Sequence, residues 1–262
     1  AAAPGFLLAA LVLFTLKEPR AYVQARVRQD AQSATFTETL RYLRAKPAYW
    51  KLGCAAGVRA FIAYGHGPFL ASFFYRVHGE EVARVGAALG MEPQTFVGVI
   101  MALTVGLLGM LGIWVGGRIA DRAARTDISA YGTISAWATI VLVPVTIWGL
   151  LTGNLILAIA LQGVSYFVQA FWAGPVYASA QSMVPPHMRA KSSAIMIFMI
   201  NLGGLLVGAL VVGALSDLLH FGGGLDTAEA LRWSLIITVA ASIVAAPLVW
   251  SARRSIAREI ES

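Results

Sequence analysis

The chain has 262 residues, of which 58% are hydrophobic and only 13% carry a charge, with a net charge of +7. Soluble proteins average about a quarter charged residues, so this composition excludes an ordinary soluble domain and predicts an all-α membrane protein. One cysteine and four histidines without ligand spacing give no reason to expect a disulfide framework, a metal site or a cofactor.

The first predicted element is a partial transmembrane helix at residues 1–16. This uncharged run is shorter than the about 20 residues that cross a bilayer. It also lacks the basic residues that precede the apolar core of a signal peptide. We therefore expect the chain to begin inside a helix and to be a fragment of a longer protein.

Residues 17–47 are predicted to form a cytoplasmic linker that contains an amphipathic helix. Thr35 and Glu38 have the spacing of a capping box, and Phe36 and Leu40 fall on one face of the helix that follows. Such a helix is expected on the cytoplasmic surface of the membrane. A plain connection between two halves of a protein fits the same residues.

A six-helix transmembrane bundle is predicted for residues 48–252. Pro93–Gly117 contains no charged residue, and its length is enough to cross a bilayer. The uncharged run Ile128–Pro186 would be about 88 Å long as one helix, so it must fold back, and Leu151–Leu155 supplies the turn residues. The remaining predicted spans are Leu52–Tyr75, Ser192–Ser216 and Trp233–Ala252.

The basic residues alternate between the two sides of the predicted membrane. All 20 lie in one alternating set of loops and tails, except for Arg59, Arg76, Arg84 and Arg232. Because basic loops stay in the cytoplasm, this set is predicted to be cytoplasmic, and it includes the tail at 253–262. The protein is expected in the cell (inner or plasma) membrane. The placement of basic residues in cytoplasmic loops then explains the positive charge, and no nucleic-acid partner is expected.

Three polar side chains are predicted to share a level near the middle of the membrane. Arg59 lies about 13 Å from Trp50 along its helix, and Gln169 and Asn201 lie at a similar depth in theirs. A charge at that depth usually faces a cavity or a partner, and none of these spans contains an acidic residue. We expect the three side chains to bind substrate, with Arg59 on an anionic group. A structural pairing, or a side chain that reaches back to the interface, is the alternative for Arg59.

Three further side chains are candidates for a transport path. Tyr64 and Trp172 are expected to form cavity walls for an apolar part of a ligand, although core or interface aromatics give the same pattern. His66 lies two turns beyond Arg59 on nearly the same helix face, which makes it a candidate for proton sensing. A hydrogen-bonded packing histidine is the simpler alternative.

Glycine and proline patterns predict where helices pack and bend. Glycines spaced by three or four within 106–116, and a dense group of glycines within 203–213, favour close helix packing. Gly67–Pro68 and Gly174–Pro175 each place a proline inside a span, where it removes a backbone hydrogen bond and allows a kink. Both pairs are candidate gates, since broken helices line substrate paths in transporters; static kinks are the alternative.

The segment "GGRIADRAAR" at Gly116–Arg125 resembles the signature loop of the major facilitator superfamily, Gly-x-x-x-Asp-Arg followed by further basic residues. The motif positions are filled by Gly117, Asp121, Arg122 and Arg125. The chain departs from the pattern at Ala124, where a glycine is usual, and at Thr126. The resemblance implies a latch between the two halves on the cytoplasmic side. Physically, Gly117 would end a helix tightly, and Asp121 would accept backbone N–H groups at a helix N-terminus; a topology signal alone is the alternative.

The loop follows the third of seven predicted helices, which matches its second copy in the superfamily. The resemblance therefore implies the C-terminal half of a twelve-helix transporter, with the end of the sixth helix at 1–16 and helices seven to twelve at 48–252. Three segments are similar to the spinster branch: "LKEPRAY" (16–22), "AYGHGPFLASFFYRVHG" (63–79) and "VPPHMRAKSSA" (184–194). That branch implies proton-coupled, alternating-access transport of lipid-like amphiphiles such as sphingosine phosphates and lysophospholipids.

The expected partners are membrane lipids, a small amphiphilic substrate and the missing N-terminal half. Two alternatives remain open: a drug or solute carrier for a non-lipid substrate, and a receptor or scaffold with the same fold. An enzyme is not expected, because no predicted span carries paired carboxylates, a metal cluster or a nucleophile with its base.

Overall fold

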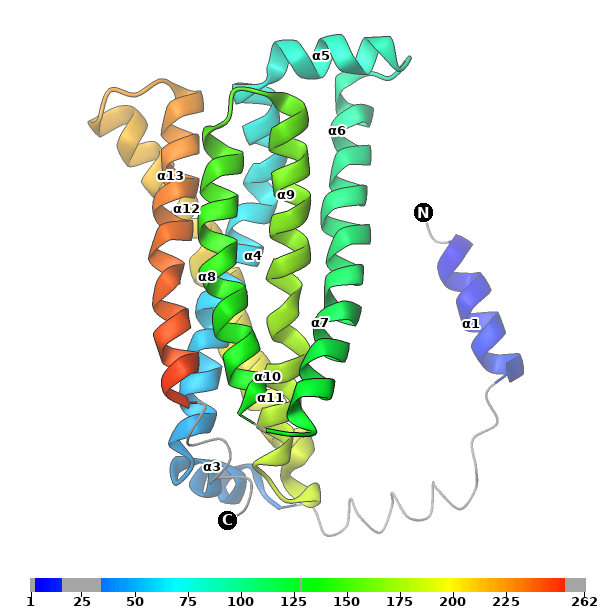
Figure 1. Ribbon diagram of the computed structural model, residues 1–262, viewed down its shortest axis with the longest axis vertical. Helices are drawn as coiled ribbons and strands as arrows, with labels where there is room; N and C mark the ends of the chain where they lie inside the picture. The colour runs from blue at the N-terminus through cyan, green and yellow to red at the C-terminus, as the bar shows by residue number, and fades with distance from the viewer. Residues whose placement is uncertain (1–2, 16–33, 128, 253–262) are drawn as a thin grey trace.

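The computed structural model describes residues 3–15, 34–127 and 129–252, and the regular structure of these residues is helical (Figure 1). The predicted tail at 253–262, most of the predicted linker and all of the segment at 16–22 lie outside the described residues. The α-helices are α1 (Ala3–Thr15), α3 (Phe36–Arg44), α4 (Pro47–Val77), α5 (Gly79–Ala88), α6 (Pro93–Met101), α7 (Gly109–Ala124), α8 (Ala130–Leu151), α9 (Leu155–Gln169), α10 (Ala173–Ser182), α11 (Arg189–Asn201), α12 (Ala209–Asp217) and α13 (Thr227–Ala241). Segments of other helix types join or extend them: the π-helical η1 (Ala102–Leu108), η4 (Leu202–Gly208) and η5 (Leu218–Gly222), and the 3-10 turns η2 (Ala170–Trp172), η3 (Pro186–Met188) and η6 (Ser242–Val244).

Five helical stretches in the described part of the chain are long and apolar enough to cross a membrane. They are Pro93–Ala124, Ala130–Leu151, Leu155–Ser182, Pro186–Gly222 and Thr227–Ala252. The 31-residue α4 runs alongside them but is not among the five, because Arg59, His66 and many small residues lower its hydropathy (Figure 1). The predicted all-α membrane fold is confirmed, with α4 packed among five more apolar helices.

Two of the long helices widen at mid-length, where the sequence predicts uninterrupted spans. The π segment η1 joins α6 to α7, and η4 joins α11 to α12. In a π turn each N–H bonds to the carbonyl five residues back, so one extra residue is accommodated without breaking the helix. The chain direction therefore continues through both segments.

Backbones approach closely where α4 crosses η4, and also where Gly112 and Gly116 of α7 face Phe167 and Phe171. A Cβ atom added to Gly203 would lie 2.8 Å from the carbonyl oxygen of Gly57, and one added to Gly208 would lie 2.8 Å from that of Phe61. Side chains at these positions would force the helices apart, so the predicted glycine packing is confirmed at this crossing. In contrast, Gly106 in η1 has no such neighbour within 4 Å.

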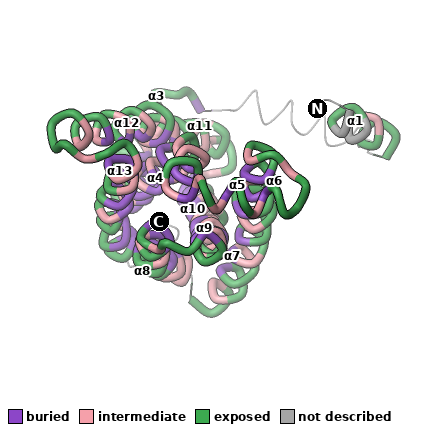
Figure 2. Tube along the Cα trace, turned by 90° about the horizontal axis from the view of Figure 1, so that it is seen from above, coloured by how far each residue is buried: buried purple, intermediate pink, exposed green. Residues whose placement is uncertain are grey.

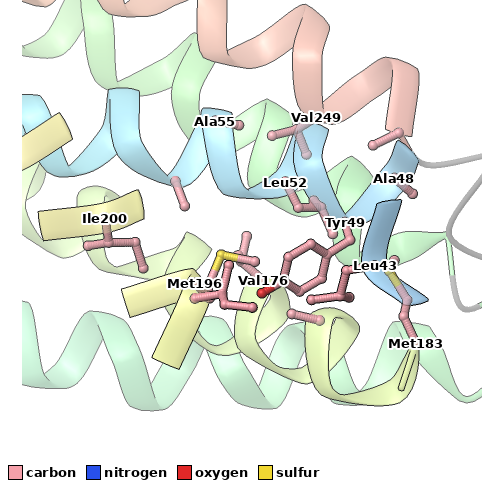
Figure 3. Close-up of a cluster of buried hydrophobic side chains, with 14 of the residues drawn as sticks. Leu43, Ala48, Tyr49, Leu52, Ala55, Val176, Met183, Met196, Ile200 and Val249 are labelled. Carbon is pink, nitrogen blue, oxygen red and sulfur yellow. The ribbon is translucent and has the colours of Figure 1, made fainter. Parts of the chain in front are cut away.

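The buried residues lie where the helices face one another, while the residues on the outer surfaces of the bundle are mostly exposed or partly exposed (Figure 2). In the half of the bundle next to α3, Tyr49 packs with Leu43 and Met196, and its hydroxyl donates to the Ser192 carbonyl at 2.6 Å (Figure 3). This bond and the surrounding cluster join α3, α4 and α11 into one core.

Two short helices lie across the ends of the bundle, α3 at one end and α5 at the other (Figure 1). The predicted capping box of α3 is confirmed: Thr35 N–H donates to Glu38 at 2.7 Å, and Glu38 N–H donates to the Thr35 hydroxyl at 3.2 Å. The Thr35 backbone bond holds the pKa of Glu38 below its ordinary value. Leu43 is fully buried against the bundle and Phe36 is 56% exposed, so the two faces of α3 meet different surroundings.

Candidate substrate site and cytoplasmic latch

Arg59 and Gln169 join α4 to α9 inside the bundle by reciprocal hydrogen bonds. A terminal guanidinium nitrogen of Arg59 donates to the Gln169 carbonyl at 3.0 Å, and the Gln169 amide donates to the Arg59 carbonyl at 3.1 Å. The other terminal nitrogen of Arg59 donates to the Thr139 hydroxyl of α8 at 3.3 Å. Arg59 is only 2% exposed. The three helices therefore meet at one buried cation.

The Gln169 carbonyl is available to Arg59 because the helix changes type there. In a continuous α-helix it would accept the N–H of Ala173, but that N–H bonds to the Ala170 carbonyl in the 3-10 turn η2. Pro175 follows one turn later and cannot donate a backbone hydrogen bond. The predicted irregularity at Gly174–Pro175 is thus accompanied by a non-α turn, whereas α4 continues as one α-helix through Pro68.

The charge of Arg59 has no acidic partner in the described part of the chain. Its Nε atom and the Gln169 Oε1 atom are both buried without a hydrogen bond in these residues. Burying a cation without a counter-ion is costly. In this conformation the guanidinium reaches substrate only if α4 and α9 separate, because both helices enclose it.

An open apolar groove lies beside Tyr64, between α4 and η1. Its volume is about 660 Å³, and its lining includes Tyr64, Gly67, Val105 and Tyr166. Tyr64 is 42% exposed, so its ring is accessible from the groove. Sites for small molecules typically have about 300–1,000 Å³, so this groove has the size for one side of a substrate site.

A small cavity with polar side chains on part of its wall lies behind this groove and shares Ala63 and Tyr166 with it. Its volume is about 20 Å³, which leaves room for about one water molecule. Its walls include His66, Gln162 and Gln169. The apolar groove and the Arg59 pair are therefore separated by a thin polar layer.

Of the other predicted site residues, His66 lines the small cavity, whereas Trp172 and Asn201 lie apart from it. The His66 imidazole is within 2.9 Å of the Thr238 hydroxyl of α13 and is buried, as a packing histidine would be. Trp172 is half-buried in η2 and packs on the core cluster of Figure 3. Asn201 ends α11, half-buried, and lines neither the groove nor the small cavity.

The sequence analysis did not predict two residues of the site, Tyr166 and Thr139. Tyr166 lies between Gln162 and Gln169 on one face of α9, and this spacing of four and three residues was a usable signal. Thr139 bonds Arg59 but resembles any other threonine in an apolar span. No sequence signal distinguishes it.

The signature residues lie at the end of α7. Arg118, Asp121, Arg122 and Arg125 line a polar depression of about 300 Å³, and the Arg118 guanidinium stacks 4.4 Å above the Trp114 ring. Gly117 faces α10, because a Cβ on Gly174 would lie 3.7 Å from the Gly117 Cα. The two glycines predicted for gating are thus in contact.

Two expectations for this loop are wrong. α7 does not end at Gly117 but continues to Ala124, because the alanine and arginine residues beyond it favour helix. Asp121 therefore lies near the C-terminus of a helix and caps no N-terminus. Its carboxylate instead accepts a hydrogen bond from the Tyr131 hydroxyl of α8 at 3.2 Å.

The family model described as the Major Facilitator Superfamily matches residues 1–207. The chain belongs to this superfamily. It is 29% identical over 259 residues to an MFS-type efflux pump of Mycolicibacterium smegmatis, covering 98% of this chain and 56% of that protein. As a member with several apolar helices, it is a multi-pass membrane protein.

Two crystal structures of a bacterial homologue of the human lysosomal transporter Spinster share the fold. The inward-facing, unoccupied form has a TM-score of 0.68 at 20% identity, covering 98% of this chain and 58% of that one. The inward-facing, occupied form has a TM-score of 0.65 at 21% identity, with 98% and 57% covered. The chain thus spans little more than half the length of the relatives that it matches.

Proposed function

We propose that this chain forms the C-terminal half of a secondary transporter that works by alternating access against a second, N-terminal half. The observation that carries the proposal is the open groove beside Tyr64, backed by the polar layer and the buried Arg59. In transporters of related design, substrate binds near the midplane between two such bundles. The depression at the end of α7 acts as the cytoplasmic latch of this cycle, and the C-terminus is cytoplasmic.

The proposed substrate is an amphiphilic anion of lipid-like shape. Tyr64 and the apolar groove receive the hydrocarbon part, and Trp172 is assigned to the same part of the ligand, which it meets only when the helices move. Arg59, Gln169 and Asn201 receive the anionic group when α4 and α9 move apart. Arg59 suits phosphoryl or sulfate groups because its guanidinium binds them through two parallel hydrogen bonds. Transport is proton-coupled, with His66 as the proton-sensing residue.

The first experiment is flux of a labelled lysophospholipid in proteoliposomes that contain the complete transporter, with and without a pH gradient. Tyr64→Ala should abolish gradient-driven flux. The matched control is Tyr75→Ala, which removes the same side chain from the same helix, eleven residues away and outside the groove. Equal flux in both variants contradicts the assignment of the groove, and no flux in wild type contradicts the lipid substrate.

Flux and binding measurements in the same proteoliposomes distinguish the proposed lipid carrier from the two alternatives, a drug carrier and a receptor. Flux of cationic dyes without lysophospholipid flux favours a drug carrier, in line with the name of the mycobacterial relative. Asp121→Asn removes the charge that accepts the Tyr131 hydroxyl and should stop turnover in a carrier. Ligand binding that survives this variant, in a protein with no flux of any solute, indicates a receptor. His66→Gln should remove only the dependence on the pH gradient.

A further inference from the structure

A second groove, here called the lateral groove, opens between α11–η4 and α13–η6, with α4 as its floor. Its volume is about 640 Å³. Cys54, Val58 and Phe61 of α4 form the floor, while Leu202 and Val207 stand on one wall and Val244 on the other. It shares no lining residue with the groove beside Tyr64. The two grooves therefore lie on different faces of α4.

The lateral groove offers hydrocarbon contacts and no free hydroxyl group. The hydroxyl groups on its lining belong to Thr238 and Ser242. Both already donate to backbone carbonyls, Thr238 to Ser234 at 2.8 Å and Ser242 to Val239 at 2.6 Å. Meanwhile Leu202, Val207 and Val244 are each more than 40% exposed. The part of a ligand that fits here is apolar along its whole length.

The shape of the groove follows from irregular helices on both sides. The wall at Leu202–Val207 belongs to the π segment η4, and the opposite wall belongs to the 3-10 turn η6. A wide turn facing a tight turn keeps the two helices from packing along a common ridge. From Cys54 to Phe61 the floor extends about 10 Å along α4. This is most of one leaflet of a hydrocarbon core about 30 Å thick.

A cation marks the end of the groove that lies next to α3. Lys51 lies three residues before Cys54 and seven before Val58, and so occupies the same face of α4. It is half-buried and pairs with no carboxylate in the described part of the chain. The predicted topology places this end at the cytoplasmic headgroup level. An apolar channel of leaflet length that ends at a lysine matches an anionic phospholipid.

We propose that the lateral groove binds one acyl chain of an anionic phospholipid of the inner leaflet, with the phosphate beside Lys51. Near a membrane surface one lysine favours an anionic over a neutral headgroup by about fivefold. The lipid fills the space between α11 and α13 and leaves the groove beside Tyr64 free. The proposal does not depend on which solute the protein carries.

The test uses the complete transporter in detergent and follows alkylation of the Cys54 thiol by mass spectrometry. Phosphatidylglycerol should protect Cys54 at an about fivefold lower concentration than phosphatidylcholine. Lys51→Gln should make the two lipids equal, and Val58→Trp, which fills the floor, should remove protection by both. A Leu206→Cys variant reports non-specific coverage, because this residue is 58% exposed on η4 but does not line the groove.

Three results would overturn the proposal. One is equal protection of Cys54 by both lipids in the wild type. Another is an unchanged preference in Lys51→Gln. The third is a Cys54 thiol that does not react in lipid-free detergent, which would mean that another part of the transporter covers the groove. None of these measurements involves flux, so failure here leaves the proposed transport function untouched.

Discussion

Replacing Thr139 by valine removes one hydrogen-bond acceptor from the buried guanidinium of Arg59 and keeps the shape of the side chain. The hydroxyl is 3.3 Å from the arginine nitrogen and only 1% exposed, so water does not take its place. Side-chain hydrogen bonds between membrane helices contribute about 0.6 kcal/mol on average and up to about 1.7 kcal/mol. The donor here is charged, so we expect the free energy of unfolding to fall by about 1.5 kcal/mol.

The assay is a double-mutant cycle on the complete transporter, with unfolding by denaturant in detergent. In an Arg59→Met background, Thr139→Val should cost less than about 0.5 kcal/mol, because only the bond from Thr139 to the Ser135 carbonyl is then lost. Thr146→Val is the matched control on the same helix, α8, since it breaks a neutral bond to Ser165 of α9. Its cost should be the same in both backgrounds.

An equal cost of Thr139→Val with and without Arg59 would refute the reasoning. The guanidinium would then not use the hydroxyl, and the buried cation would be held by Gln169 alone. A coupling near 1 kcal/mol or above supports the three-helix junction.

Three further outcomes follow from the packing and capping of the helices. Gly203→Ala places a methyl group 2.8 Å from the Gly57 carbonyl and should lower the free energy of unfolding by about 1–3 kcal/mol, whereas Gly106→Ala in η1 should be tolerated. Asn154→Ala removes the side chain that caps α9 at 2.9 Å and should cost about 1 kcal/mol in the same unfolding assay; no loss would mean that water replaces the cap. Backbone N–H groups hold the pKa of Asp226 below its ordinary value. Its contribution is complete above about pH 4 and is lost as pH falls through the lower folded pKa. Asp226→Asn should therefore flatten the fall of Tm in acid, and an unchanged pH profile would contradict this cap.

Much of the fold could be predicted from the sequence, because a membrane helix can be identified as a long run without charged residues. Pro93–Gly117 and the turn at Leu151–Leu155 show this clearly: α8 ends at Leu151, and Asn154 caps α9. The π segments could not be predicted, because an inserted residue leaves hydropathy unchanged. The continuation of α7 past Gly117 was missed because a glycine permits a helix end without requiring one.

The candidate site was harder to predict. The sequence indicates the depth of a side chain in the membrane, but not the direction in which the side chain points from its helix. Arg59 and Gln169 were correctly expected at one level, and the structure shows them paired. That Arg59 points into its own bundle depends on the tertiary arrangement of three helices. The acceptor that it uses on Gln169 is a backbone carbonyl released by a 3-10 turn, and no side-chain pattern encodes such an acceptor.

The junction at Arg59 also bears on how the protein is made. α4 is not apolar enough to count among the membrane spans, and a cation at the bilayer centre costs about 2.5–3.5 kcal/mol on insertion. Its partners Thr139 and Gln169 come 80 and 110 residues later in the chain. At about 5–20 residues per second, the ribosome delivers Gln169 roughly 5–20 s after Arg59. Arg59 therefore has neither of these hydrogen-bond partners when α4 is first synthesised, and its buried position gains both bonds only after α8 and α9 have followed.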